Sequence, residues 1–198
     1  WAESVKSLDS TEVLTFGDDG REENRWQAPY IPKSQISEPT AMCPRNLLGP
    51  VRKALARVVE SSGMDIDAFV CHKLGWNMQQ LEERLDSEQV DAIALAISSL
   101  DEGAGFTTAD MTGLGKGRVV ATVCAYARQQ GKKVMFMTEK ADLFSDFYHD
   151  VIDTGGMEVL GKPFIINNDL VVRDPYTNKP MFRSPDRESA SVIMACGE

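Results

Sequence analysis

The sequence has few of the residues that build disulfide and metal frameworks. Its 198 residues include only four cysteines and two histidines. The cysteines lie far apart and lack Cys-x-x-Cys spacing, at Cys43, Cys71, Cys124 and Cys196. This argues against a structural zinc site and against a disulfide scaffold, so we expect a reducing compartment. His72 and His149 lack a second ligand at metal-binding spacing, and no metal cluster is predicted.

Long hydrophobic runs and an excess of positive charge are also missing. No stretch approaches the roughly 18 apolar residues of a membrane span, and the first residues do not resemble a signal peptide. The chain has 21 Lys+Arg against 30 Asp+Glu, a net charge of −9, which excludes nucleic-acid binding through bulk positive charge. We therefore expect an intracellular protein of the cytoplasm or nucleus, without a membrane partner.

The acidic residues are unevenly distributed. Residues 79–102 contain seven acidic side chains and one basic one, whereas residues 103–198 contain twelve and eleven. The C-terminal half is therefore nearly neutral, and a local nucleic-acid contact there stays open.

The composition, 42% hydrophobic, suits one main domain. Residues 1–45 are polar and turn-rich and predict an extended arm or linker. Residues 46–86 predict a small helical segment, and residues 87–198 the main domain. Because the sequence opens on Trp1 and ends at Glu198 without an evident terminal element, we expect a piece of a longer polypeptide.

Hydrophobic periodicity and capping residues predict helices over 45–61, from Asp65 or Asp67 to Leu74, from Asn77 to Leu85, and from Ser87 to Gly103 or Gly105. From residue 106 the pattern becomes α/β. It predicts a strand at 106–110, a helix at 118–130, a strand at 133–138 covered on both faces, and a helix at 140–152. A hairpin or two short strands follow at 163–173, and then a turn at 174–178.

A glycine-rich loop lies between the first predicted strand and the following helix. It reads Ala109-Asp110-Met111-Thr112-Gly113-Leu114-Gly115-Lys116-Gly117-Arg118. Glycines let backbone N–H groups converge on an anion, the helix N-terminus adds a favourable dipole, and Lys116 supplies a charge for the outer phosphates. The plainer interpretation is a tight connection, which the strand–loop–helix context disfavours.

The residue after Lys116 departs from the usual phosphate-loop pattern. That position normally carries the Ser or Thr hydroxyl that holds Mg²⁺, and Gly117 has none. Either acids elsewhere and the phosphates hold the ion, with Thr112 as a nearby hydroxyl, or the loop binds nucleotide poorly.

Two further elements are candidates for ligand contact. Gln89 carries a donor and an acceptor that could pair with an adenine edge, although a helical glutamine is more often a solvated surface residue. Residues 138–146 begin at the end of a predicted strand, where open α/β sheets place ligand contacts; a capping turn into the next helix is an equal interpretation.

These segments together resemble superfamily 2 helicase-type ATPases, and more closely their strawberry-notch-like branch. The resemblance covers residues 75–160. In that branch the loop lysine is followed by Gly-Arg, as Lys116 is by Gly117 and Arg118 here. The core of the loop also resembles that of chromatin remodellers. The resemblance implies an α/β P-loop (RecA-like) parallel-sheet domain, incomplete in this chain and preceded by small helices and the arm.

The resemblance also implies roles for individual residues. Gln89 would read adenine, and Lys116 would be the catalytic lysine. The phosphates would be cradled by Thr112, Gly113, Leu114, Gly115, Lys116, Gly117 and Arg118. Nucleic acid, DNA rather than RNA, would contact Thr138, Glu139, Lys140 and Asp142. ATP and Mg²⁺ are the implied cofactors, with the remainder of the polypeptide as a second partner.

The family's Asp-Glu pair on a later strand and its second lobe are not found in this sequence. We therefore expect this chain to bind ATP but not to hydrolyse it efficiently. Large phage proteins that protect DNA from restriction carry such a region, which adds the phage virion and then the host cytoplasm as a setting. The alternative function is a structural or packaged interaction module with a vestigial loop. A small-molecule kinase is disfavoured by Gly117.

Overall fold

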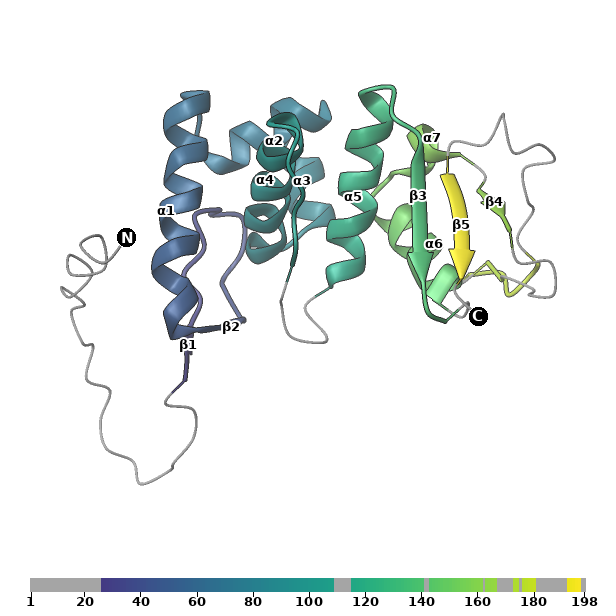
Figure 1. The fold of residues 1–198 in the computed structure, drawn as a ribbon, viewed down its shortest axis with the longest axis horizontal. Helices are drawn as coiled ribbons and strands as arrows, with labels where there is room; N and C mark the ends of the chain where they lie inside the picture. The colour runs from purple at the N-terminus through teal and green to yellow at the C-terminus, as the bar shows by residue number, and fades with distance from the viewer. Residues whose placement is uncertain are drawn as a thin grey trace.

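The structure is a computed structural model. It describes residues 26–108, 115–140, 143–161, 163–166, 173–174, 176–180 and, for the backbone alone, 192–196. A group of helices lies at one end of these residues and a small sheet at the other, with helix α5 between them (Figure 1).

The helices begin and end close to the positions predicted from periodicity. They are α1 Arg45–Ser62, α2 Ile66–Leu74, α3 Met78–Arg84, α4 Ser87–Asp101, α5 Lys116–Gln129, α6 Leu143–Asp153 and α7 Met157–Leu160. Asp65 caps α2 by accepting the N–H of Ala68, and Asn77 forms a capping box with Gln80. The short helix α7 was not predicted. Among the described helices, none has the length and apolar character needed to cross a bilayer.

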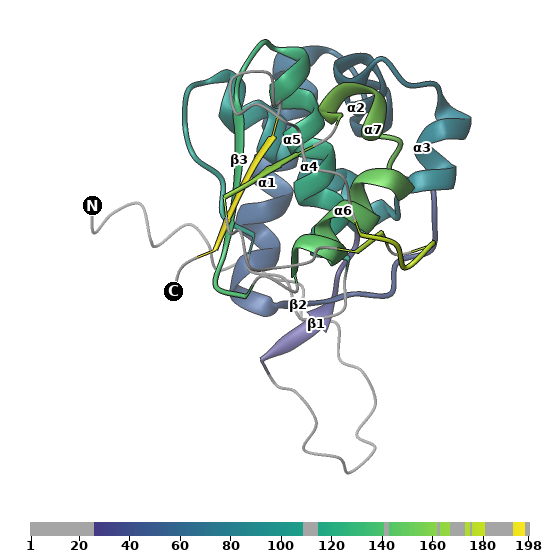
Figure 2. The same ribbon diagram turned by 90° about the vertical axis from the view of Figure 1, so that its right-hand side faces the viewer.

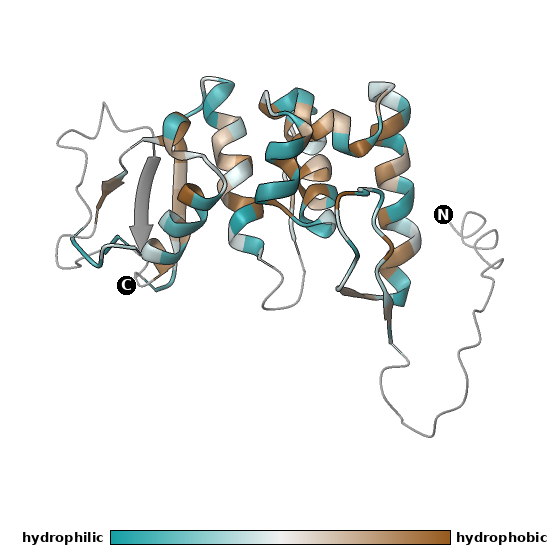
Figure 3. Cartoon of the chain, turned by 180° about the vertical axis from the view of Figure 1, so that it is seen from behind, coloured by the Kyte–Doolittle hydropathy of each residue, from teal (hydrophilic) through white to brown (hydrophobic). Residues whose placement is uncertain are grey.

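Two hydrophobic clusters form the interior, and α5 contributes to both. In the first, Val119 and Tyr126 of α5 pack with side chains of α1 to α4. In the second, Ala121 and Ala125 of the same helix pack with β3, α6, α7 and β4. The helices accordingly show alternating hydrophobic and hydrophilic positions along their length (Figure 3). Because the first cluster crosses residue 86, the predicted domain boundary there does not coincide with a break in packing.

The sheet contains three parallel strands in the order β3-β5-β4. They are β3 Val134–Thr138, β4 Phe164–Ile165 and β5 Val192–Cys196. The α/β prediction is confirmed in that helices and strands are mixed, and a complete RecA-like sheet stays a prediction. Of the hairpin or two short strands predicted at 163–173, the first short strand is confirmed as β4, which pairs with the distant β5, and the remainder stays a prediction. Residues 167–172 lie outside the described residues.

The strand predicted at 106–110 is also wrong as far as it is described. Phe106 and Thr107 are exposed, and residues 106–108 have no strand structure. Residues 106–108 descend on the side of α5 opposite β3 (Figure 1), where no strand of the described residues pairs with them. Ala109 and Asp110 lie outside the described residues.

Strand β3 is covered on one face rather than on both. Val134 and Phe136 face the second cluster, with α6 and α7 to one side of the strands (Figure 2). Met135 and Met137 are 52% and 72% exposed. The prediction of a strand buried on both faces is therefore wrong, since the apolar run mixes core and surface positions.

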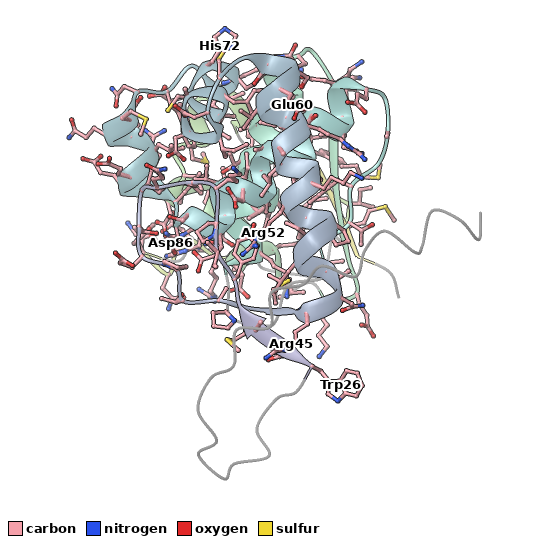
Figure 4. All side chains as sticks on the ribbon, turned by 90° about the vertical axis from the view of Figure 1, so that its left-hand side faces the viewer. Trp26, Arg45, Arg52, Glu60, His72 and Asp86 are labelled. Carbon is pink, nitrogen blue, oxygen red and sulfur yellow. The ribbon has the colours of Figure 1, made fainter. Side chains whose placement is uncertain are left out.

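The described part of the arm, residues 26–44, is fixed to the helices. Its ends form the antiparallel pair β1 Gln27–Pro29 and β2 Met42–Pro44, and Trp26 projects into solvent before β1 (Figure 4). The buried carboxylate of Asp91 in α4 accepts hydrogen bonds from the Tyr30 hydroxyl and from the backbone N–H groups of Lys33 and Ser34, at 2.7, 2.8 and 2.9 Å. Glu88 Oε1 accepts the N–H groups of Thr40 and Ala41.

Replacing Asp91 should release the arm. In Asp91→Asn the amide group must face at least one of the three donors, which costs about 1–3 kcal/mol for the unpaired group. We expect hydrogen exchange at the Lys33 and Ser34 amides to become at least about tenfold faster. Glu82→Ala, an exposed change on α3, is the control, and unchanged exchange in Asp91→Asn would contradict this account.

A polar contact ties α5 to α2 and α4. Asp101 accepts a hydrogen bond from Tyr126 and one from Lys73 at 2.7 Å. Burial alone raises the pKa of Asp101, but these two donors outweigh it and leave the pKa below its usual value. Burial and the neighbouring carboxylate raise the pKa of Tyr126 to about 12.

Stability should therefore depend on Asp101 in a pH-dependent way. A lowered folded pKa stabilises the protein above the unfolded pKa of about 3.9, and this contribution is lost as the pH falls through the folded pKa. Because Asp101 and Lys73 are partly exposed, Asp101→Asn should cost only about 1 kcal/mol at pH 7. Urea unfolding from pH 7 to about 3 should show this difference shrinking, and a pH-independent difference would argue against the ionic contribution.

Candidate functional site

The candidate site lies at the N-terminus of α5. Gly115 is the N-cap and adopts a left-handed backbone with φ 66° and ψ 35°, a conformation that glycine accepts at little cost. Lys116 is the first helical residue. The first N–H groups of a helix and its dipole favour an anion at this end. Thr112, Gly113 and Leu114 lie outside the described residues.

Gln89 of α4 lies in close contact with Gly115. It is buried in the first turn of α4, where its Oε1 accepts the N–H of Asp86 at 3.0 Å. Its amide nitrogen lies so close to Gly115 that a Cβ at that position would be 2.2 Å from Nε2. The structure therefore places two predicted site residues, Gln89 and Gly115, in contact. It places Gln89 in a buried cap rather than on a solvated surface, and its adenine-reading role stays a prediction.

Gly117 is in similarly close contact with Asp150 of α6. A Cβ at position 117 would lie 1.8 Å from Asp150 Oδ2 and 2.8 Å from Cγ. Burial raises the pKa of Asp150, and the neighbouring Arg118 guanidinium lowers it in part. The missing side chain at position 117 thus makes room for a half-buried carboxylate beside the loop.

Arg118 extends toward α3 and α6. Its guanidinium donates to Asp153 Oδ2 at 3.2 Å and to the carbonyl of Arg84 at 3.4 Å. Asp153 also lies 3.4 Å from His149 Nδ1 and accepts a hydrogen bond from the Tyr176 hydroxyl. The predicted phosphate ligand is therefore engaged in a network that joins the start of α5 to α6.

The predicted nucleic-acid residues lie at the end of β3 and directly after it, with Thr138 as the last residue of the strand. Thr138 is half-buried, whereas Glu139 and Lys140 are exposed. Figure 1 places this end of β3 at the same side of the molecule as the start of α5, which is the edge where parallel sheets bind ligands. Asp142 lies outside the described residues.

The described side chains fit an anion better than a metal ion alone. They include no group of three His, Cys, Asp or Glu residues placed to hold a metal. Magnesium, however, needs only one or two carboxylates when phosphates and water complete its shell. The start of α5, Lys116 and the carboxylate of Asp150 are compatible with a magnesium-bound phosphate compound.

Sequence reasoning missed Asp150. Helical spacing places it on α6, but nothing in the sequence says which face of α6 meets α5. The one available signal was Gly117 itself, because a glycine in a helical first turn can indicate that another group approaches closely.

One comparison with known proteins gives a match. The model of a family described as P-loop containing NTP hydrolase pore-1 matches residues 53–168, more than half of the chain. It covers α2 to α7 and most of α1. No curated protein matches, and no solved structure matches.

The contact between Gly115 and Gln89 can be tested with a matched glycine. Gly115→Ala introduces both left-handed strain and a clash with Gln89, whereas Gly131→Ala, with φ 75° and nothing within 4 Å, introduces strain alone. Strain should cost about 1–2 kcal/mol at either position. We expect Gly115→Ala to lose more in chemical denaturation, and Gln89→Ala to recover the excess in the double variant. Equal losses at the two glycines would contradict the contact.

Proposed function

Because the chain belongs to the P-loop containing NTP hydrolase pore-1 family, we propose that the start of α5 binds the phosphates of ATP as part of a superfamily 2-like helicase or translocase. Family membership gives the coarser statement, a nucleotide-binding ATPase-like domain. The assignment to a superfamily 2-like helicase or translocase is supported by the residues around the loop.

The observation that carries the proposal is the fixed N-terminus of α5. Gly115 begins the helix in a left-handed conformation with Lys116 directly after it, and both faces of the helix are packed in hydrophobic clusters. A preorganised helix N-terminus binds phosphate without ordering its own backbone.

Each residue then has a defined part in binding. The backbone N–H groups of residues 115–117 would face the phosphates, since that of Arg118 is donated to the Gly115 carbonyl at 3.0 Å. The Lys116 ammonium would pair with the outer phosphates. Magnesium, when bound with the nucleotide, supplies charge neutralisation at the β- and γ-phosphates. Gln89 would set the position of the loop through Gly115.

The wider proposal is that the intact protein acts on nucleic acid as a helicase or translocase. Thr138 ends β3, and Glu139 and Lys140 follow it, at the same side of the molecule as the start of α5. This position suits a contact that senses nucleotide binding. Hydrolysis and movement along DNA would need the Asp-Glu strand and a second lobe from the remainder of the polypeptide. The support for a phage-encoded protein that protects DNA from restriction is the sequence resemblance over residues 75–160 alone.

A second candidate is an interaction module with a vestigial loop. Residues 106–108 do not form the strand that normally leads into a phosphate loop, which favours this candidate. The two candidates differ in whether Lys116 matters for nucleotide binding.

Calorimetric titration of ATP, with magnesium and with EDTA, tests the proposal. Lys116→Ala should weaken binding roughly 10- to 100-fold, the scale of one charge-assisted phosphate contact. Lys132→Ala, an exposed lysine beyond the other end of α5, should leave binding unchanged. If the folded wild-type chain shows no heat in either buffer, the vestigial module replaces the ATP-binding proposal.

A further inference from the structure

The space beside Gly117 is filled by one oxygen atom of a neighbouring helix. The Asp150 carboxylate lies where a side chain at position 117 would begin, 1.8 Å from the position of an added Cβ. In most phosphate loops this residue is Ser or Thr, whose hydroxyl holds Mg²⁺. At Gly117 the hydroxyl is missing, and an oxygen from α6 is in its place.

We propose that Asp150 supplies the magnesium-facing oxygen that Gly117 cannot, so that the ion of a bound magnesium nucleotide is held by Asp150, the phosphates and water. The inference rests on the proposed function, because the ion enters with the nucleotide. One carboxylate combined with phosphates is a common way for proteins to hold Mg²⁺.

Asp150 suits this role better than the other acids of α6. Asp153 is already shared by Arg118, His149 and Tyr176, and Asp146 is exposed. Within the described residues, no donor hydrogen-bonds to the carboxylate of Asp150, although it is half-buried. A carboxylate without hydrogen-bond donors keeps its oxygen lone pairs available for a cation.

The position of Asp150 makes a distinctive electrostatic prediction. Without metal, its negative charge repels the phosphates bound at the start of α5. With Mg²⁺ between them, the same charge becomes attractive. Its removal should therefore help metal-free ATP to bind and hinder magnesium-bound ATP.

The test is calorimetric titration of ATP into wild type, Asp150→Asn and Asp146→Asn, each in EDTA and in excess MgCl₂. Asp146→Asn is the matched control, since it removes an exposed carboxylate one turn earlier on the same helix. We expect Asp150→Asn to reduce the magnesium-dependent gain in affinity by at least about tenfold, since even outer-shell changes cost that much. The control should keep the wild-type gain.

Three outcomes separate the possibilities. If Asp150→Asn tightens ATP binding equally in both buffers, the carboxylate only competes with the phosphates and the inference is wrong. If Asp150→Asn leaves ATP binding unchanged in both buffers, the inference also fails, while the ATP-binding proposal stands. Absence of binding by wild type in both buffers overturns the proposed function instead.

Moving the magnesium-binding oxygen from Asp150 to a side chain at position 117 gives an independent test. Gly117→Ser alone should be destabilised by the clash with Asp150, and Asp150→Ala alone should lose the magnesium gain. In the double variant the space is free and a hydroxyl stands after Lys116, so at least part of the gain should return. Thermal unfolding of each variant confirms that it is folded, and a double variant without recovery would count against the inference.

Discussion

The packing of α5 on two sides is the constraint on which the rest of this structure depends. Val119 and Tyr126 bind it to the helical group, and Ala121 and Ala125 bind it to the sheet and α6. A helix held by both of its faces has little freedom to rotate or slide, because close-packed interiors resist small displacements. Gly115 and Lys116, at the start of the helix, are therefore fixed in position, and within the described residues α5 joins the two hydrophobic clusters.

Polar groups in the first two turns of α4 provide a second level of organisation. Glu88 and Asp91 hold the arm by its backbone N–H groups, while Gln89, between them, reaches Gly115. The buried carboxylate of Asp91 is tolerated there because it accepts three hydrogen bonds. The same short segment thus contacts both the described part of the arm, residues 26–44, and the first residue before α5, Gly115.

Local signals in the sequence predicted most helices but few of the contacts. Helices α1 to α6 follow from apolar spacing and from caps such as Asp65 and Asn77, which act within one turn. Residues 106–108 of the predicted strand are not a strand, because strand formation depends on pairing, and these residues run on the far side of α5 from β3. The pairing of β4 with β5 and the approach of Asp150 to Gly117 depend on tertiary packing between distant segments, which periodicity does not encode.

The uncovered face of β3 has a chemical consequence. Its exposed residues, Met135 and Met137, are thioethers and open to oxidation, whereas Val134 and Phe136 hold the strand from the other face. Conversion to methionine sulfoxide would make that face polar without creating a cavity in either cluster. Peroxide would therefore change the surface character of the strand while leaving its anchoring side chains intact.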